Sequence, residues 1–174
     1  MTKYYLVRPG EPDWSINEKH RLWGHGRDLP HLTQKGIEQA KEIAQDGRIR
    51  NSQIILASPY TRTMHTAAIL SKETGIDLVV EFDLREWQPD LTFQFDSLEE
   101  LKGLTDDYEA HRGIYPAGEV HRWESKELMQ KRIEGVLEQY KSYSHVTVVT
   151  HRIIMSTQAE GVDIAHCSVV EIER

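Results

Sequence analysis

Cysteine is almost absent from this sequence, in which Cys167 is the sole example. A single thiol excludes an intramolecular disulfide and a cysteine-based metal cluster, and it fits a reducing compartment, so we expect a cytoplasmic protein. Long apolar runs are also missing, because the run of residues 4–7 is followed at once by Arg8. This run is too short for a signal peptide or a membrane span, and we expect no membrane partner.

Positive charge is in short supply. The chain has 21 Lys and Arg residues against 28 Asp and Glu residues, which gives a formal net charge of −7. A chain of this sign repels nucleic-acid phosphates and anionic lipid surfaces, so we expect no nucleic-acid partner. Any recognition of phosphate must therefore be local.

Repeats, low-complexity tracts and linker-like runs of Gly, Ser or Pro are absent from the 174 residues. We therefore predict a single domain over residues 1–174, long enough to bury a substantial core. Residues 88–124 fit this interpretation least well. They are polar, with a helix predicted near residues 98–108, and we interpret them as an excursion that covers a site. The oligomeric state is left open.

Five short β-rich runs occur along the chain, at residues 4–7, 53–57, 78–82, 146–149 and 168–172. They are too apolar to alternate, which predicts strands that are buried on both faces. Helical patterns lie between them. One spans 129–140, one follows Thr33 as its N-cap, and one opens with Ser58 and Pro59 and stops before Gly75. This alternation predicts an α/β fold, a three-layer α/β/α sandwich with a mainly parallel central sheet.

Ionisable side chains follow four of the predicted strands. Arg8 closes the first, Arg62 lies in the helix after the second, Glu86 follows the third and His151 closes the fourth. Loops beyond the carboxyl ends of parallel strands form sites, so we expect these groups to line one cleft. Two guanidinium groups suit a phosphoryl dianion, while a carboxylic acid and an imidazole can transfer protons. The set indicates phosphoryl chemistry, and the alternative is a structural ion-pair cluster.

Several motifs then resemble one family, in order along the chain. LVRPGE at residues 6–11 resembles the LVRHGE signature of histidine phosphatases and cofactor-dependent phosphoglycerate mutases. Residues 21–40 resemble the substrate loop and the following helix of that family. SPYTRTMHTA at 58–67 is similar to SPLxRAxQTA, residues 84–86 to the LxE segment, and VVTH at 148–151 to the strand end with the second catalytic histidine.

The resemblance implies a phosphoglycerate mutase-like fold and assigns roles to individual residues, with no cofactor and no metal. Arg8, Arg62 and His151 would bind phosphate, and His151 and Glu86 would be catalytic. Glu86 would be the general acid, although the segment after it departs from the family pattern. The candidate substrate loop contains Arg21, Trp23 and Gly24.

Two departures from the family pattern concern the reaction. Pro9 occupies the position of the histidine that attacks phosphorus in the family, and it has neither a nucleophilic side chain nor an N–H group. Losing a nucleophile from a cooperative catalytic set can cost on the order of 10⁶ in rate. In addition, Arg152 and Ile153 replace two glycines after His151, so Arg152 is either a third cation or a plug.

The remaining histidines and tryptophans are weaker candidates. We interpret His20, His25, His31 and His65 as surface residues rather than as a metal site or a substitute nucleophile. Among Trp14, Trp23, Trp87 and Trp123, the two next to pocket motifs, Trp23 and Trp87, are the better candidates for a pocket wall.

Three functions remain open. The first, which we favour, is a catalytically impaired protein that binds a phosphate-containing small molecule or a phosphoprotein. The second is a phosphomonoesterase that uses His151 or water without a phosphohistidine at position 9. The third is a protein-interaction module with a vestigial pocket.

Overall fold

The computed structural model describes residues 1–174 and is built on one five-stranded sheet. Its strand order is β3-β2-β4-β1-β5. The strands are β1 (Lys3–Val7), β2 (Ile54–Ala57), β3 (Leu78–Val80), β4 (His145–Val149) and β5 (Val169–Glu173). Strands β1 to β4 pair in parallel, and β5 pairs antiparallel with β1. All five predicted strands are present, and the prediction of a mainly parallel sheet is confirmed.

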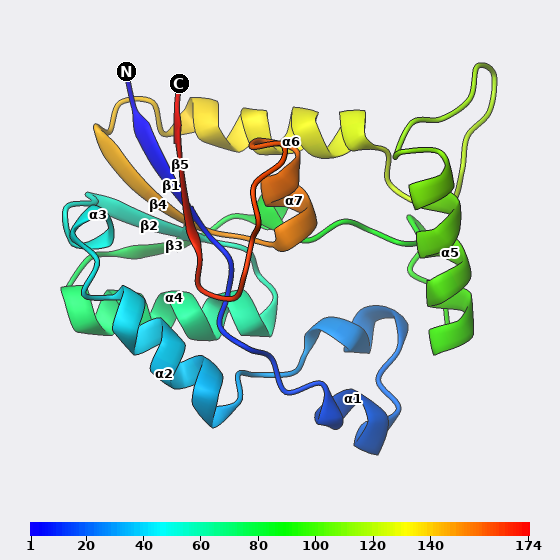
Figure 1. Cartoon of the computed structure of the whole chain (residues 1–174), viewed down its shortest axis with the longest axis horizontal. Coiled ribbons are helices and arrows are strands. Elements are labelled where there is room, and N and C mark those ends of the chain that lie inside the picture. Colours follow the sequence, from blue (N-terminus) through cyan, green and yellow to red (C-terminus); the bar gives the residue numbers. More distant parts are fainter.

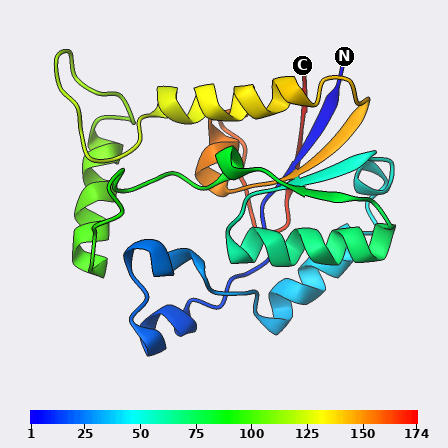
Figure 2. The same ribbon diagram turned by 180° about the vertical axis from the view of Figure 1, so that it is seen from behind.

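Helices cover both faces of this sheet (Figure 1). Helices α6 (Lys126–Gln139) and α7 (Arg152–Ser156) lie on one face, and α2 (Gln34–Ile43) and α4 (Thr61–Thr74) on the other. The short α3 (Gly47–Arg50) lies beside the sheet on the α2 and α4 side, and the view from behind shows the same layers (Figure 2). The three-layer arrangement is thus confirmed. None of the helices combines the length and the apolar character that a bilayer crossing requires.

Strands β1, β2 and β4 are buried on both faces as predicted, but this prediction was wrong for β3 and β5, which are only partly buried because they form the edges of the sheet. Side chains of alternating strand residues enter two separate clusters, one on each face of the sheet. Leu56 and Val148 pack on the α6 side, and Ile55 and Val149 pack on the α4 side, all fully buried. Burial of one such side chain contributes roughly 1.5–3 kcal/mol, so both clusters hold the ends of β2 and β4 firmly.

The helix ends test two capping predictions. Thr33 is the N-cap of α2, and its hydroxyl accepts a hydrogen bond from Gly36 N. The predicted start of α4 at Ser58 and Pro59 was wrong, because the helix begins at Thr61 with Tyr60 as N-cap. Ser58 is instead part of the loop after β2, where its hydroxyl oxygen accepts from Tyr60 N and also contacts His151. This loop therefore serves the site rather than the helix.

A glycine pair fixes the course of the chain after β1. A Cβ atom on Gly10 would lie 2.4 Å from Gly36 O, and one on Gly36 would lie 2.4 Å from Glu11 O. Only two glycines allow this approach of the loop to α2. Because Gly10 N also donates to the Thr66 hydroxyl, the loop that follows Arg8 is held against both α2 and α4.

The remaining elements lie beyond the carboxyl ends of the strands. They are α1 (Ser15–His20), the 3₁₀ turns η1 (Gly24–Asp28) and η2 (Phe82–Leu84), and α5 (Leu98–Ala110). The helix predicted near residues 98–108 is α5, which stands at the far end of α6 (Figures 1 and 2). Trp123 anchors this segment, since it is fully buried and its Nε1 donates to Asp107 on α5.

Candidate functional site

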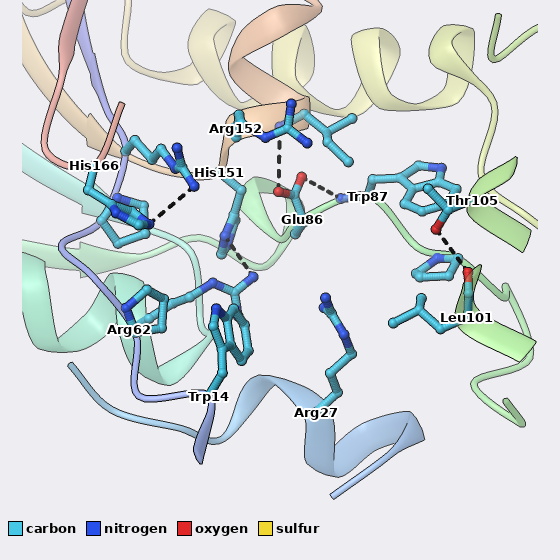
Figure 3. A pocket seen from close by; sticks show the side chains of 15 residues that line it. Trp14, Arg27, Arg62, Glu86, Trp87, Leu101, Thr105, His151, Arg152 and His166 are labelled. Atoms are coloured by element: carbon cyan, nitrogen blue, oxygen red, sulfur yellow. Dashed lines mark hydrogen bonds between the residues drawn. The ribbon is translucent and has the colours of Figure 1, made fainter. Parts of the chain in front are cut away.

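A pocket of about 250 Å³ lies at the carboxyl ends of the parallel strands. Arg8, Arg62, Glu86 and His151 all line it, so the structure brings the four sequence-predicted side chains together. Arg8 directly follows β1, and His151 lies two residues beyond the end of β4. Their convergence follows from the parallel pairing of β1 with β4, which puts both strand ends at one edge (Figure 3).

Arg8 is held by groups that leave its charge unneutralised. Its Nη1 donates to Ile164 O at 2.7 Å, and its Nη2 lies 3.2 Å from His166 Nε2. A guanidinium can only donate, so Nε2 of His166 must be the acceptor. Burial and the neighbouring Arg152 lower the pKa of Arg8, while burial and Arg8 lower the pKa of His166. This end of the pocket is therefore cationic without a carboxylate partner.

Arg62, by contrast, sits in a continuous network of hydrogen bonds. Its Nη1 donates to Asp28 Oδ1 at 2.6 Å, and its Nη2 lies 3.1 Å from His151 Nδ1. His151 Nε2 in turn lies 2.7 Å from the Ser58 hydroxyl. Asp28 thus supplies Arg62 with a counterion from 34 positions earlier in the sequence.

This network fixes the tautomer of His151. Burial, followed by Arg62, holds the pKa of His151 well below its usual range, so the ring is neutral at physiological pH. Because the Arg62 guanidinium can only donate, Nδ1 of His151 accepts and Nε2–H donates to Ser58 Oγ. Both ring nitrogens are thus engaged, and His151 has no free lone pair with which to deprotonate a water molecule in this arrangement.

Glu86 lies across the pocket on a rigid stretch of backbone. Its Oε1 accepts from Trp87 N at 2.8 Å, and its Oε2 accepts a long bond of 3.4 Å from Ile153 N (Figure 3). Loss of hydration raises the pKa of Glu86 despite these bonds. A raised pKa favours the protonated form, which is the form that can donate a proton to a leaving group.

Arg132, on α6, fixes the backbone that bears Glu86. Its guanidinium donates to the carbonyl oxygens of Asp83, Arg85 and Glu86 at 2.6, 2.7 and 3.1 Å. It also pairs with the buried Glu124 at 2.6 Å. This clamp has no signature in the sequence, since nothing in the local pattern marks Arg132 as different from the other charged residues of its helix.

Four arginines contribute to the pocket lining. Arg27 and Arg152 join Arg8 and Arg62, whereas Glu86 is the single acidic residue among the lining side chains. Arg152 is exposed and forms no ion pair, which fits a third cation at the rim better than a plug. Four guanidinium groups around one carboxyl group make the pocket suited to an anion with more than one acceptor oxygen.

Pro9 also lines the pocket, and it is buried directly after Arg8. The sequence resemblance implies that the attacking histidine of the family corresponds to this position. A tertiary amide nitrogen offers neither a lone pair for attack nor a hydrogen for an anion.

The three residues named for the candidate substrate loop do not line this pocket, although Arg27, further along the same segment, does. Neither Arg21 nor Gly24 lines it, since Arg21 is exposed and Gly24 is buried below the Phe93 carbonyl. Trp87 lines the pocket as expected, but Trp23 lines a neighbouring cavity instead.

Three further residues that were not selected from the sequence reach the pocket. Trp14, Arg27 and His166 line it, although their local sequence does not distinguish them from surface residues. The four histidines interpreted as surface residues, His20, His25, His31 and His65, do not line the pocket.

A grouping of potential metal ligands that the sequence did not suggest occurs elsewhere, in Asp107, His111 and His121. Its members already bond to one another. His121 Nδ1 bonds to the Asp107 carboxylate at 2.8 Å, and His111 Nδ1 bonds to the Asp107 carbonyl at 2.8 Å.

Comparisons with known proteins identify one family. A profile of the histidine phosphatase superfamily (branch 1) matches residues 4–170. The probable phosphoglycerate mutase GpmB of Cronobacter sakazakii is 32% identical over 141 residues, which cover 79% of this chain and 62% of that protein. This chain thus spans less than two thirds of the length of that relative.

Solved structures share the fold. Bacillus stearothermophilus YhfR aligns with a TM-score of 0.73 at 23% identity, over 99% of this chain and 91% of that chain. A mycobacterial glucosyl-3-phosphoglycerate phosphatase in complex with VO3 aligns with a TM-score of 0.71 at 17% identity, over 99% and 91% of the two chains. These likenesses confirm the predicted phosphoglycerate mutase-like architecture.

Proposed function

This chain belongs to branch 1 of the histidine phosphatase superfamily, and on that premise we propose that it binds a phosphate-containing ligand in the arginine-lined pocket without hydrolysing it efficiently. The ligand is a small phosphomonoester or the phosphorylated side chain of a protein. The observation that supports this proposal most directly is the charge of the pocket lining, in which Arg8 and Arg152 face the cavity without any carboxylate partner.

A phosphate between Arg8 and Arg62 would meet complementary donors. Arg8 is anchored by a carbonyl oxygen and a neutral imidazole, neither of which neutralises it. A charge-assisted hydrogen bond from each guanidinium contributes roughly 1.5–3 kcal/mol. To bind at Arg62, the anion must displace the Asp28 carboxylate or share the Arg62 guanidinium with it. We therefore expect modest affinity.

The proposed loss of activity rests on two features. Pro9 stands at the family's nucleophile position and cannot form a phosphohistidine, which removes the covalent step. His151 then remains as the natural base for water, but Arg62 and Ser58 occupy both of its ring nitrogens. An in-line attack by water would need a base that this arrangement does not supply.

A water-based phosphomonoesterase is the second candidate, and the raised pKa of Glu86 favours it. A protonated Glu86 could still protonate a leaving alkoxide. This candidate requires that ligand binding moves Arg62 from His151 Nδ1 to the phosphate, which would free one nitrogen.

Calorimetry with inorganic phosphate, paired with turnover of p-nitrophenyl phosphate, tests the proposal. We expect phosphate binding with little or no turnover, and the appearance of turnover in Pro9→His. Robust wild-type turnover that survives purification and disappears in His151→Ala would establish the water-based reaction. The absence of both phosphate binding and turnover would instead support an interaction module with a vestigial pocket.

A further inference from the structure

A second cavity adjoins the arginine-lined pocket. It measures about 240 Å³ and shares three wall residues with the first pocket, namely Trp14, Arg27 and Leu101. Its other walls include Trp23 from the loop before η1 and Leu98 from the first turn of α5. Arg27 and Leu101 lie across the first pocket from His166 (Figure 3), and both also line the second cavity.

The two cavities differ in chemistry. The first is lined by four arginines, whereas two indole rings and two leucines form most of the walls of the second. Trp14 is 41% exposed and Leu98 is 63% exposed, so large apolar side chains are left uncovered beside a charged pocket. Covering such side chains releases water, and burial of apolar area contributes about 25 cal/mol per Å².

Asn17 offers a sugar or a polyol no free amide group, which leaves the charged side chains of Glu18 and Arg27 as the main polar groups of the second cavity. Asn17 Nδ2 donates to the carbonyl oxygens of Leu22 and Arg27, and its Oδ1 is out of reach of solvent. Glu18, which is exposed at this cavity, would repel a second phosphate or carboxylate. Hydroxyl groups placed against the faces of the two indoles and against the two leucines would lose hydrogen bonds to water without replacement, which costs free energy.

We propose that the second cavity holds the organic group of the phosphate ligand and that this group is an aromatic ring. The ligand is then an aryl or arylalkyl phosphomonoester, with its phosphate at Arg8 and Arg62 and its ring between the indole of Trp23 and the side chains of Leu98 and Leu101. This inference rests on the proposed function, because it assumes that the phosphate occupies the first pocket.

Three phosphonates test the inference, since their P–C bonds resist hydrolysis whether or not the chain is active. Methylphosphonate, 2,3-dihydroxypropylphosphonate and benzylphosphonate share an anionic group and differ in the attached group. We expect benzylphosphonate to bind about tenfold or more tightly than the other two in calorimetry, as burial of one ring face implies. Leu98→Ala and Trp23→Ala should shrink this advantage and leave the affinity for inorganic phosphate unchanged.

The control is Leu128→Ala on α6, because Leu128 is 43% exposed and lines neither cavity. Leu98 is mostly exposed, so Leu98→Ala tests the cavity even if Trp23→Ala fails to fold. Equal affinity for all three phosphonates would overturn the aromatic assignment, and so would tighter binding of benzylphosphonate that is unchanged in Leu98→Ala. Neither result would contradict phosphate binding in the first pocket. Absence of binding by all three phosphonates and by inorganic phosphate would overturn the proposed function itself.

Discussion

Replacement of Arg62 by alanine is the sharpest test of the anion pocket. The substitution removes a guanidinium that lies among the pocket walls and donates to Asp28 and His151 in the free protein. Loss of one charge-assisted contact to a bound phosphate costs about 1.5–3 kcal/mol, which corresponds to a roughly 10- to 150-fold rise in Kd. We expect a rise in Kd near the lower end of this range, because wild-type Arg62 must give up part of its bond to Asp28 when phosphate binds.

Calorimetric titration with inorganic phosphate at pH 7 and low ionic strength measures the effect. Arg48→Ala is the matched control, since Arg48 pairs with Asp46 on the surface and does not line the pocket. Thermal unfolding of both variants shows whether the fold is intact. Equal phosphate affinity in wild type and Arg62→Ala, with both folded, would refute the assignment of Arg62 to anion binding.

Three further predictions follow from the same geometry. Pro9→His should raise turnover of p-nitrophenyl phosphate and yield an acid-labile phosphohistidine; the absence of both would show that Pro9 is not what blocks the reaction. Arg132→Met should lower the free energy of unfolding by about 3–5 kcal/mol, because it leaves the buried Glu124 without its partner; urea denaturation measures this loss, and a change below about 1 kcal/mol would contradict the clamp. His151 stays neutral in the folded state while an unfolded imidazole protonates below its ordinary pKa of 6.5. The unfolding free energy should therefore fall as pH drops below 6.5, by up to about 1.4 kcal/mol per pH unit. In His151→Gln, the free energy of unfolding should fall less steeply with decreasing pH than in wild type. Identical slopes in the two proteins would argue against a neutral His151.

The sequence predicted those features that depend on chain order and periodicity. Apolar runs without alternation identified the five strands, and parallel pairing of β1, β2 and β4 then placed Arg8, Arg62 and His151 at one edge. Such convergence needs no knowledge of side-chain contacts, because the topology alone brings the strand ends together.

What the sequence could not predict depends on contacts between distant segments. The bond between Asp28 and Arg62 and the clamp of Arg132 on the Glu86 segment join residues that are 34 and 46 positions apart. Neither has a local signature. The Ser58 cap failed for a related reason, because its hydroxyl accepts from Tyr60 N and contacts His151 in the folded protein, while the helix itself begins at Thr61.

The backbone around Pro9 shows that the sheet tolerates a proline at this position. The parallel pairing of β1 ends at Val7, whose carbonyl accepts from Thr150 N, so the sheet requires no N–H group at position 9. Arg8 continues the strand, since its N–H donates to Ser168 O and its carbonyl accepts from Cys167 N. A proline disfavours helical backbone at the preceding residue and so favours the extended course that Arg8 follows. Replacing a histidine by proline here would remove a nucleophile without removing a backbone hydrogen bond of the sheet, and Arg8 would still project into the pocket. The backbone around an anion pocket at Arg8 is therefore compatible with a proline at position 9.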